Sequence, residues 1–141
     1  MSTHVPYLFK VQLKRLEKKM AAINVTEAQF EELLLKEGTV LVDFWAAWCG
    51  PCRSFAPVYE AASEKYPDLT FAKVDTEAER SLAAAAGITS IPTLMIFRDG
   101  ILLFSQPGAL PGSALDDLIT QVSALDMNEI RKEIAADAAK E

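Results

Sequence analysis

The chain has 141 residues, half of them hydrophobic, and a net charge of −6. This length allows one domain with a sizeable core, and the hydrophobic fraction argues against general disorder. An acidic chain repels phosphate backbones and no apolar run reaches the roughly 18 residues of a membrane span, so neither nucleic acid nor a membrane is expected as a partner.

Residues 1–20 differ in charge from the rest of the chain. They carry five basic residues and one acid, a charge of +4, and subtracting this from −6 leaves −10 on the remainder. The change of sign predicts a basic N-terminal extension followed by an acidic domain. The extension has three interpretations: a helix that binds a membrane surface or a partner, a solvated leader, or a segment absent from the cellular protein because translation starts at Met20. Its basic residues interrupt any secretory apolar stretch, so a cytoplasmic location is expected.

The domain is predicted to begin with a short apolar strand over 22–25. Thr26 and Gln29 have the spacing of a capping box, which predicts the start of a helix. The apolar residues that follow recur at helical spacing, and Gly38 is predicted to end this helix.

A second strand is predicted over 39–46, where the residues are almost all apolar and often β-branched. The next helix is predicted to start at the cysteines and to end near Tyr66, with Pro57 inside it as a source of a kink. A third strand follows over 69–75.

The remaining elements predict a mixed sheet. A helix over 77–87 is expected to end at Gly87, and two strands over 93–97 and 101–105 are joined by Arg98-Asp99-Gly100, which favours a hairpin. A helix over 113–122 and a tail helix from Asp126 complete the chain. The early βαβ order implies parallel strands and the hairpin adds antiparallel ones, so the fold class is α/β with helices on both faces of a central mixed sheet.

The only two cysteines, Cys49 and Cys52, allow three interpretations. A structural disulfide would close a very short loop and stabilise little. A zinc site needs four ligands, and the only histidine of the chain is His4 in the extension. A redox pair fits best, because Cys49 follows a buried strand and is expected at a helix N-terminus, where a thiolate is stabilised. Cys52 is expected one turn further on and more covered.

A buried acid is predicted next to this pair. Release of a mixed disulfide needs the thiol of Cys52 deprotonated, and no histidine lies in the predicted domain to accept its proton. Asp43 interrupts the apolar strand, so burial should raise its pKa towards neutrality. Asp43 is therefore the expected proton acceptor, and a purely structural carboxylate is the alternative.

The chain resembles the thioredoxin family over residues 23–122. The matching features occur in the family's order: Asp43, Trp48-Cys49-Gly50-Pro51-Cys52, Pro57, Lys73, Ser90-Ile91-Pro92-Thr93 and Gly108-Ala109. This resemblance implies the thioredoxin fold, a three-layer sandwich around a central mixed sheet. It further implies a cis peptide bond before Pro92 and a position of Lys73 beside Asp43.

The resemblance also implies an activity, namely protein-disulfide reduction by dithiol–disulfide exchange. Cys49 would attack a target disulfide, Cys52 would resolve the mixed disulfide, and Asp43 with Lys73 would assist. Gly50 and Pro51 would tune the redox pair, and the docking surface would include Trp48, Ile91, Pro92 and Gly108. The implied partners are disulfide-containing target proteins and a thioredoxin reductase, which supplies electrons from NADPH, with no cofactor bound to the chain itself and with the chain acting as a monomer.

Some positions depart from the family pattern. Pro107 stands where a β-branched residue is common, which affects the shape of the substrate groove, and Pro111 replaces a Ser-like helix cap. The predicted domain spans 21–125, and 126–141 form a helical extension that is either solvated or docks a partner. Two other functions are possible for this sequence. One is an oxidant or isomerase, which is disfavoured because oxidising relatives usually have a histidine between the cysteines. The other is a binding subunit without turnover.

Overall fold

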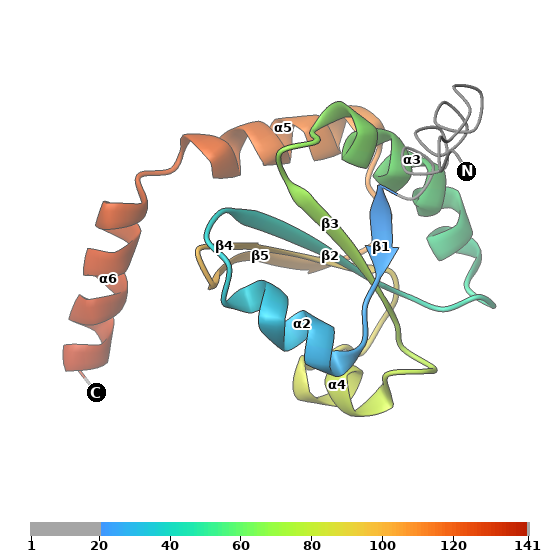
Figure 1. Ribbon diagram of the computed structural model, residues 1–141, viewed down its shortest axis with the longest axis horizontal. Coiled ribbons are helices and arrows are strands. Elements are labelled where there is room, and N and C mark those ends of the chain that lie inside the picture. Colours follow the sequence, from blue (N-terminus) through green and yellow to red (C-terminus); the bar gives the residue numbers. More distant parts are fainter. Residues whose placement is uncertain (1–20, 141) are drawn as a thin grey trace, which may run out of the picture.

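The computed structural model of the chain describes residues 21–140 (Figure 1). The basic extension over 1–20 lies outside the described residues. Its three interpretations therefore stay predictions.

A five-stranded mixed sheet forms the centre of the molecule (Figure 1). The spatial order is β1-β3-β2-β4-β5, with β1 and β2 parallel to β3, and with β4 antiparallel to both β2 and β5. The strands are β1 (Ala22–Asn24), β2 (Thr39–Trp45), β3 (Thr70–Asp75), β4 (Thr93–Arg98) and β5 (Ile101–Pro107). This arrangement confirms the predicted mixed sheet.

Helices cover both faces of the sheet and bury two separate halves of the core (Figure 1). Helices α2 (Glu27–Leu34) and α4 (Arg80–Ala85) cover one face, and α3 (Gly50–Lys65) and α5 (Gly112–Ala124) cover the other. Because successive side chains of a strand point to opposite faces, β2 contributes Val40 and Val42 to the core under α2 and α4. It contributes Leu41 to the core under α3 and α5. The central strand is therefore buried on both sides, as its apolar sequence predicted.

Helix α2 begins as predicted and ends earlier than predicted. The amide of Gln29 donates to the hydroxyl of Thr26 (3.3 Å) and the amide of Thr26 donates to the side chain of Gln29 (3.0 Å). These two bonds confirm the capping box. The prediction that Gly38 ends this helix is wrong, because Leu35 already caps it. Gly38 instead has φ +96° in the turn before β2, where its amide donates to Oδ1 of Asp99 at 2.7 Å.

Local turn chemistry explains the next boundaries. Asp99 and Gly100 both have positive φ, 53° and 78°. They form the two-residue hairpin turn expected between β4 and β5. Gly87 has φ 72° just after the last turn of α4, as predicted for a helix end. Helix α4 starts at Arg80 rather than near residue 77, because the amide of Glu77 is bound by the side chain of Asp75 in a preceding turn (2.9 Å).

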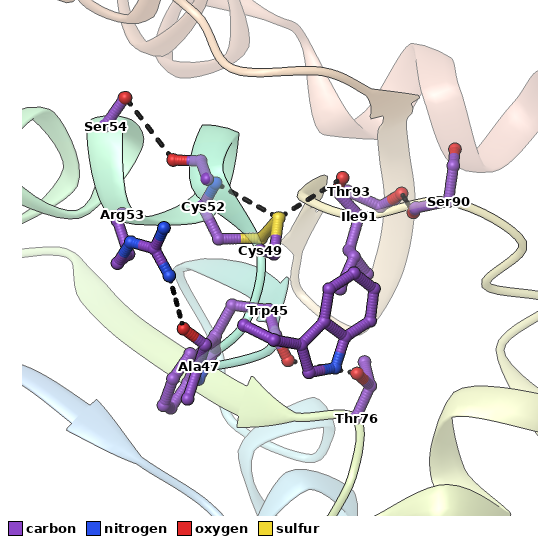
Figure 2. Close-up of a disulfide and its surroundings, with 12 residues drawn as sticks. Trp45, Ala47, Cys49, Cys52, Arg53, Ser54, Thr76, Ser90, Ile91 and Thr93 are labelled. Atoms are coloured by element: carbon purple, nitrogen blue, oxygen red, sulfur yellow. Dashed lines mark hydrogen bonds between the residues drawn. A yellow bond between two sulfur atoms is a disulfide. The ribbon is translucent and has the colours of Figure 1, made fainter.

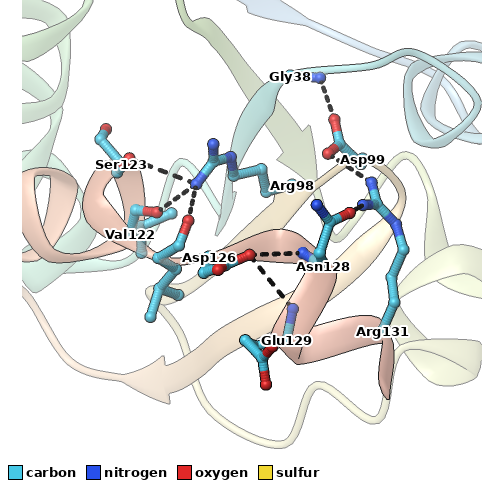
Figure 3. Close-up of polar contacts among 10 residues, drawn as sticks. Gly38, Arg98, Asp99, Val122, Ser123, Asp126, Asn128, Glu129 and Arg131 are labelled. Atoms are coloured by element: carbon cyan, nitrogen blue, oxygen red, sulfur yellow. Dashed lines mark hydrogen bonds and ion pairs between the residues drawn. The ribbon is translucent and has the colours of Figure 1, made fainter. Parts of the chain in front are cut away.

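The C-terminal helix α6 (Met127–Ala139) is joined to the sheet only by its first turns (Figure 3). Asp126 caps its N-terminus, as predicted, and Met127 is buried. Nη2 of Arg131 donates to Oδ2 of Asp99 at the hairpin turn (3.0 Å). Ile134 further along remains 48% exposed, and the helix stands to one side of the sheet in Figure 1. The later turns of this helix, over 131–139, are therefore uncovered.

Arg98 ties the end of α5 to the sheet (Figure 3). Its Nη1 donates to the carbonyl oxygens of Val122 and Leu125, both at 3.0 Å. These carbonyls belong to the last turn and cap of α5, where carbonyls have no partner within the helix.

Within residues 21–140, none of the helices combines the length and apolar character needed to cross a membrane.

Candidate active site

The two cysteines form a disulfide at the N-terminus of α3 (Figure 2). Cys49 is the N-cap residue of this helix, and its Cα lies 5.2 Å from that of Cys52. The amide of Cys52 donates to Sγ of Cys49 at 3.2 Å. Pro51 lies in the first helical turn, where its missing N–H removes no helix bond. An amide and the positive end of the helix dipole thus face Cys49, which stabilises its thiolate when the disulfide is reduced.

Both cysteines are mostly covered by neighbouring residues. Cys49 is 4% exposed and Cys52 is 3% exposed, so the predicted difference in coverage is small. They pack together with Ala46, and Trp45 and Ile91 lie against them.

The segment at Ile91 and Pro92 reaches the disulfide from a distant part of the chain. The carbonyl oxygen of Ile91 lies 3.7 Å from Sγ of Cys49 (Figure 2), and the peptide bond between Ile91 and Pro92 is cis, as the resemblance implied. Pro92 is buried, and its carbonyl accepts a hydrogen bond from the amide of Gly108 at 2.8 Å. Pro107, just before, lies at the end of the edge strand β5, where a missing amide is tolerated.

A surface groove runs past the disulfide. Its lining is formed by the α3 N-terminus, the turn after β3 and the segment before Pro92, and includes Trp48, Cys49, Gly50, Pro51, Thr76 and residues 88–91. None of these lining side chains, all within the described part of the chain, is charged. Trp48 is 67% exposed on its rim. Of the predicted docking residues, Pro92 and Gly108 are not part of this lining; Pro92 is buried and Gly108 is exposed.

Asp43 lies in β2, on the strand face that α3 covers, and is 1% exposed. Neither carboxylate oxygen has a hydrogen-bond partner within residues 21–140. Burial raises the pKa of Asp43 from 3.8 to about 7, while the positive charge of Lys73 lowers it. Lys73 is the direct neighbour of Asp43 in the register of β2 and β3, and its Nζ lies 4.8 Å from the ring centroid of Trp45. Asp43 can therefore gain or lose a proton near neutral pH.

The zinc interpretation finds no support in the described part of the chain. Residues 21–140 contain no group of three or more His, Cys, Asp or Glu side chains placed to hold a metal ion. The position of the cysteines at a helix N-terminus instead suits a pair that cycles between dithiol and disulfide.

Comparison with known proteins agrees with this geometry. The family model described as thioredoxin matches residues 21–121. The chain belongs to the thioredoxin family. It is 52% identical over 120 residues to a protein named as a second thioredoxin of Streptomyces coelicolor, covering 85% of this chain and 90% of that protein. It is 38% identical over 103 residues to thioredoxin of Bacillus subtilis, covering 72% of this chain and 98% of the relative.

Solved structures show the same fold. A mutant thioredoxin of Halobacterium salinarum matches with a TM-score of 0.69 and 34% identity, covering 74% of this chain and 93% of that one. Oxidised mitochondrial thioredoxin 3 of Saccharomyces cerevisiae matches with a TM-score of 0.66 and 28% identity, covering 74% of this chain and 98% of that one. The predicted thioredoxin fold is confirmed, and the chain is a protein-disulfide oxidoreductase that works through Cys49 and Cys52.

One contact of this site was not predicted from the sequence. Nε1 of Trp48 donates to Oε1 of Glu77 at 3.0 Å, across 29 positions of the chain. Glu77 lies in the turn after β3, and nothing in its local pattern distinguishes it from other exposed acids.

Proposed function

We propose that the chain is a general protein-disulfide reductase in which Cys49 is the nucleophile. The thiolate of Cys49 attacks one sulfur of a target disulfide, a bond forms between Cys49 and that sulfur, and the second target sulfur leaves as a thiolate. Cys52 then loses its proton and attacks Sγ of Cys49. The internal disulfide forms, the first target sulfur leaves, and the target has gained two electrons. The position of Cys49 as the N-cap of α3 is the observation that carries this assignment.

We further propose that Asp43 accepts the proton of Cys52, directly or through water, with Lys73 modulating its charge. The support is the raised pKa of Asp43, which lies close to the pH at which the reaction must run. Replacement by Asn should slow the release of a trapped mixed disulfide at neutral pH. An unchanged single-turnover rate for Asp43→Asn would contradict this role.

The docking surface is proposed to comprise Trp48, Gly50, Pro51, Ile91, Pro92 and Gly108. The uncharged lining of the groove suits an extended target segment, whose backbone can pair with the carbonyl and amide of Ile91. We expect a thioredoxin reductase to return the disulfide to the dithiol with electrons from NADPH. We also propose that the chain acts as a monomer in the cytoplasm. Its redox domain would span 21–125, followed by a helical extension over 126–141.

The reduction potential separates this function from that of an oxidant or isomerase. We would equilibrate the Cys49–Cys52 pair in glutathione buffers and follow the fluorescence of Trp45 and Trp48. A potential below about −240 mV is expected for a reductant, and one near about −180 mV or above would contradict it.

A capture experiment separates a reductase from a binding subunit. With Cys52→Ser, a reductase should hold many target proteins through mixed disulfides at Cys49. A binding subunit should instead hold one partner even when both cysteines are replaced.

A further inference from the structure

The side chain of Trp48 is fixed although it is largely exposed. It precedes the nucleophile Cys49, lines the groove and is 67% exposed. An exposed indole without a partner can rotate freely at χ1 and χ2. Here its Nε1 donates to Oε1 of Glu77 at 3.0 Å, so the ring is tied to the turn that follows β3.

Glu77 is itself held at three points, two on its backbone and one on its carboxylate. Its amide donates to Oδ1 of Asp75 at 2.9 Å. Nη2 of Arg80 lies 3.2 Å from its Oε2, and Nε of Arg80 donates to its carbonyl oxygen at 3.3 Å. Each carboxylate oxygen of Glu77 therefore has one donor, Trp48 on one side and Arg80 on the other.

This arrangement contributes little to the stability of the fold. The side chains of Arg80 and Glu77 are 81% and 51% exposed. Exposed ion pairs of this kind have small effects on unfolding. Their placement beside the groove has a different consequence. A side chain that is already ordered loses less conformational freedom when a partner binds, so a fixed indole strengthens docking.

We propose that Glu77, held by Arg80, is a positioning residue that keeps the indole of Trp48 in one orientation on the groove rim, so that protein targets dock on a preorganised aromatic surface. This inference rests on the proposed function. It concerns docking of large targets, and the reactivity of the cysteines towards small disulfides is independent of it.

The test compares docking with chemistry in single-turnover reactions of the full, pre-reduced chain. Insulin serves as the protein disulfide and hydroxyethyl disulfide as a small one that does not span the groove. The dependence of the rate on insulin concentration separates an apparent docking constant from a limiting rate. For Glu77→Ala we expect the docking constant to weaken about threefold to tenfold and the limiting rate to stay within about twofold. The rate with hydroxyethyl disulfide should not change.

Variants and spectroscopy distinguish positioning from a general structural effect. Glu77→Gln keeps an acceptor oxygen for the indole and should recover most of the loss, whereas Arg80→Ala should show part of it. The indole N–H signal of Trp48 in nitrogen–proton spectra, assigned with Trp48→Phe, should shift and exchange faster with solvent in Glu77→Ala.

A second exposed pair provides the matched control. Glu129 and Lys132 form an ion pair with the same three-residue spacing on α6, far from the groove in sequence (Nζ to Oε1, 3.3 Å). Glu129→Ala should behave as the wild type in every reaction. An unchanged insulin docking constant in Glu77→Ala, an equal loss with hydroxyethyl disulfide, or an equal loss in Glu129→Ala would overturn the inference. A wild-type chain that reduces neither substrate would overturn the proposed function as well.

Discussion

Replacing Asp43 by Asn should stabilise the folded protein, and the gain should grow with pH. Burial holds the pKa of Asp43 at about 7, against 3.8 for an ordinary aspartate. Well below pH 3.8 the carboxyl is protonated in both states, so its burial has no pH-dependent cost. As the pH rises towards 7, the unfolded chain loses this proton while the folded chain keeps it, and the folded state becomes less stable.

The size of the effect follows from the two pKa values. Each pH unit between them changes the free energy of unfolding by about 1.4 kcal/mol, so the full cost reaches about 4 kcal/mol above pH 7. Asn has nearly the same shape and does not ionise. The difference in unfolding free energy between Asp43→Asn and wild type should therefore widen by about 3 kcal/mol from pH 5 to pH 8.

Urea unfolding of both proteins at a series of pH values would measure this difference. The disulfide form should be used, because bonded cysteines do not titrate and cannot contribute their own pH dependence. A difference between the two proteins that stays constant from pH 5 to pH 8, or that narrows, would refute the assignment of a raised pKa to Asp43.

Three further predictions concern contacts outside the redox pair. Arg98→Met should lower the free energy of unfolding by about 1–3 kcal/mol, because carbonyls at the end of α5 lose their charged donor; urea unfolding measures it, and an unchanged midpoint would contradict it. Gly100→Ala should cost at least about 1 kcal/mol more than Gly38→Ala by the same method. Both glycines have positive φ, but of the two only Gly100 would bring a Cβ against the backbone oxygen of Leu34, at 2.8 Å, so equal costs would contradict the clash. Asp126→Ala should loosen α6 by about 1 kcal/mol, seen as faster hydrogen exchange of its amides without a matching loss of global stability; unchanged exchange would argue against the cap.

Features that depend on neighbouring residues were predicted well from the sequence. The capping box at Thr26, the hairpin turn at Asp99 and the helix start at Cys49 each follow from a few adjacent residues whose backbone preferences agree. The end of α2 was mispredicted because Gly38 carries a strong local signal that serves the turn into β2, where Asp99 from the distant hairpin binds its amide. Local pattern alone does not distinguish these two uses of a glycine.

The sequence by itself determined the chemistry of this protein: a cysteine pair with helical spacing, an acid inside an apolar strand, and the order of strands and helices that builds a mixed sheet. Each of these features depends on a short segment of the sequence, because backbone sterics and burial of apolar side chains act on residues that are close along the chain. Only the tertiary structure decided which distant residues meet. It brought Ile91 to Cys49, placed Glu77 on the indole of Trp48 and left most of α6 uncovered, because packing joins segments whose local patterns carry no information about each other.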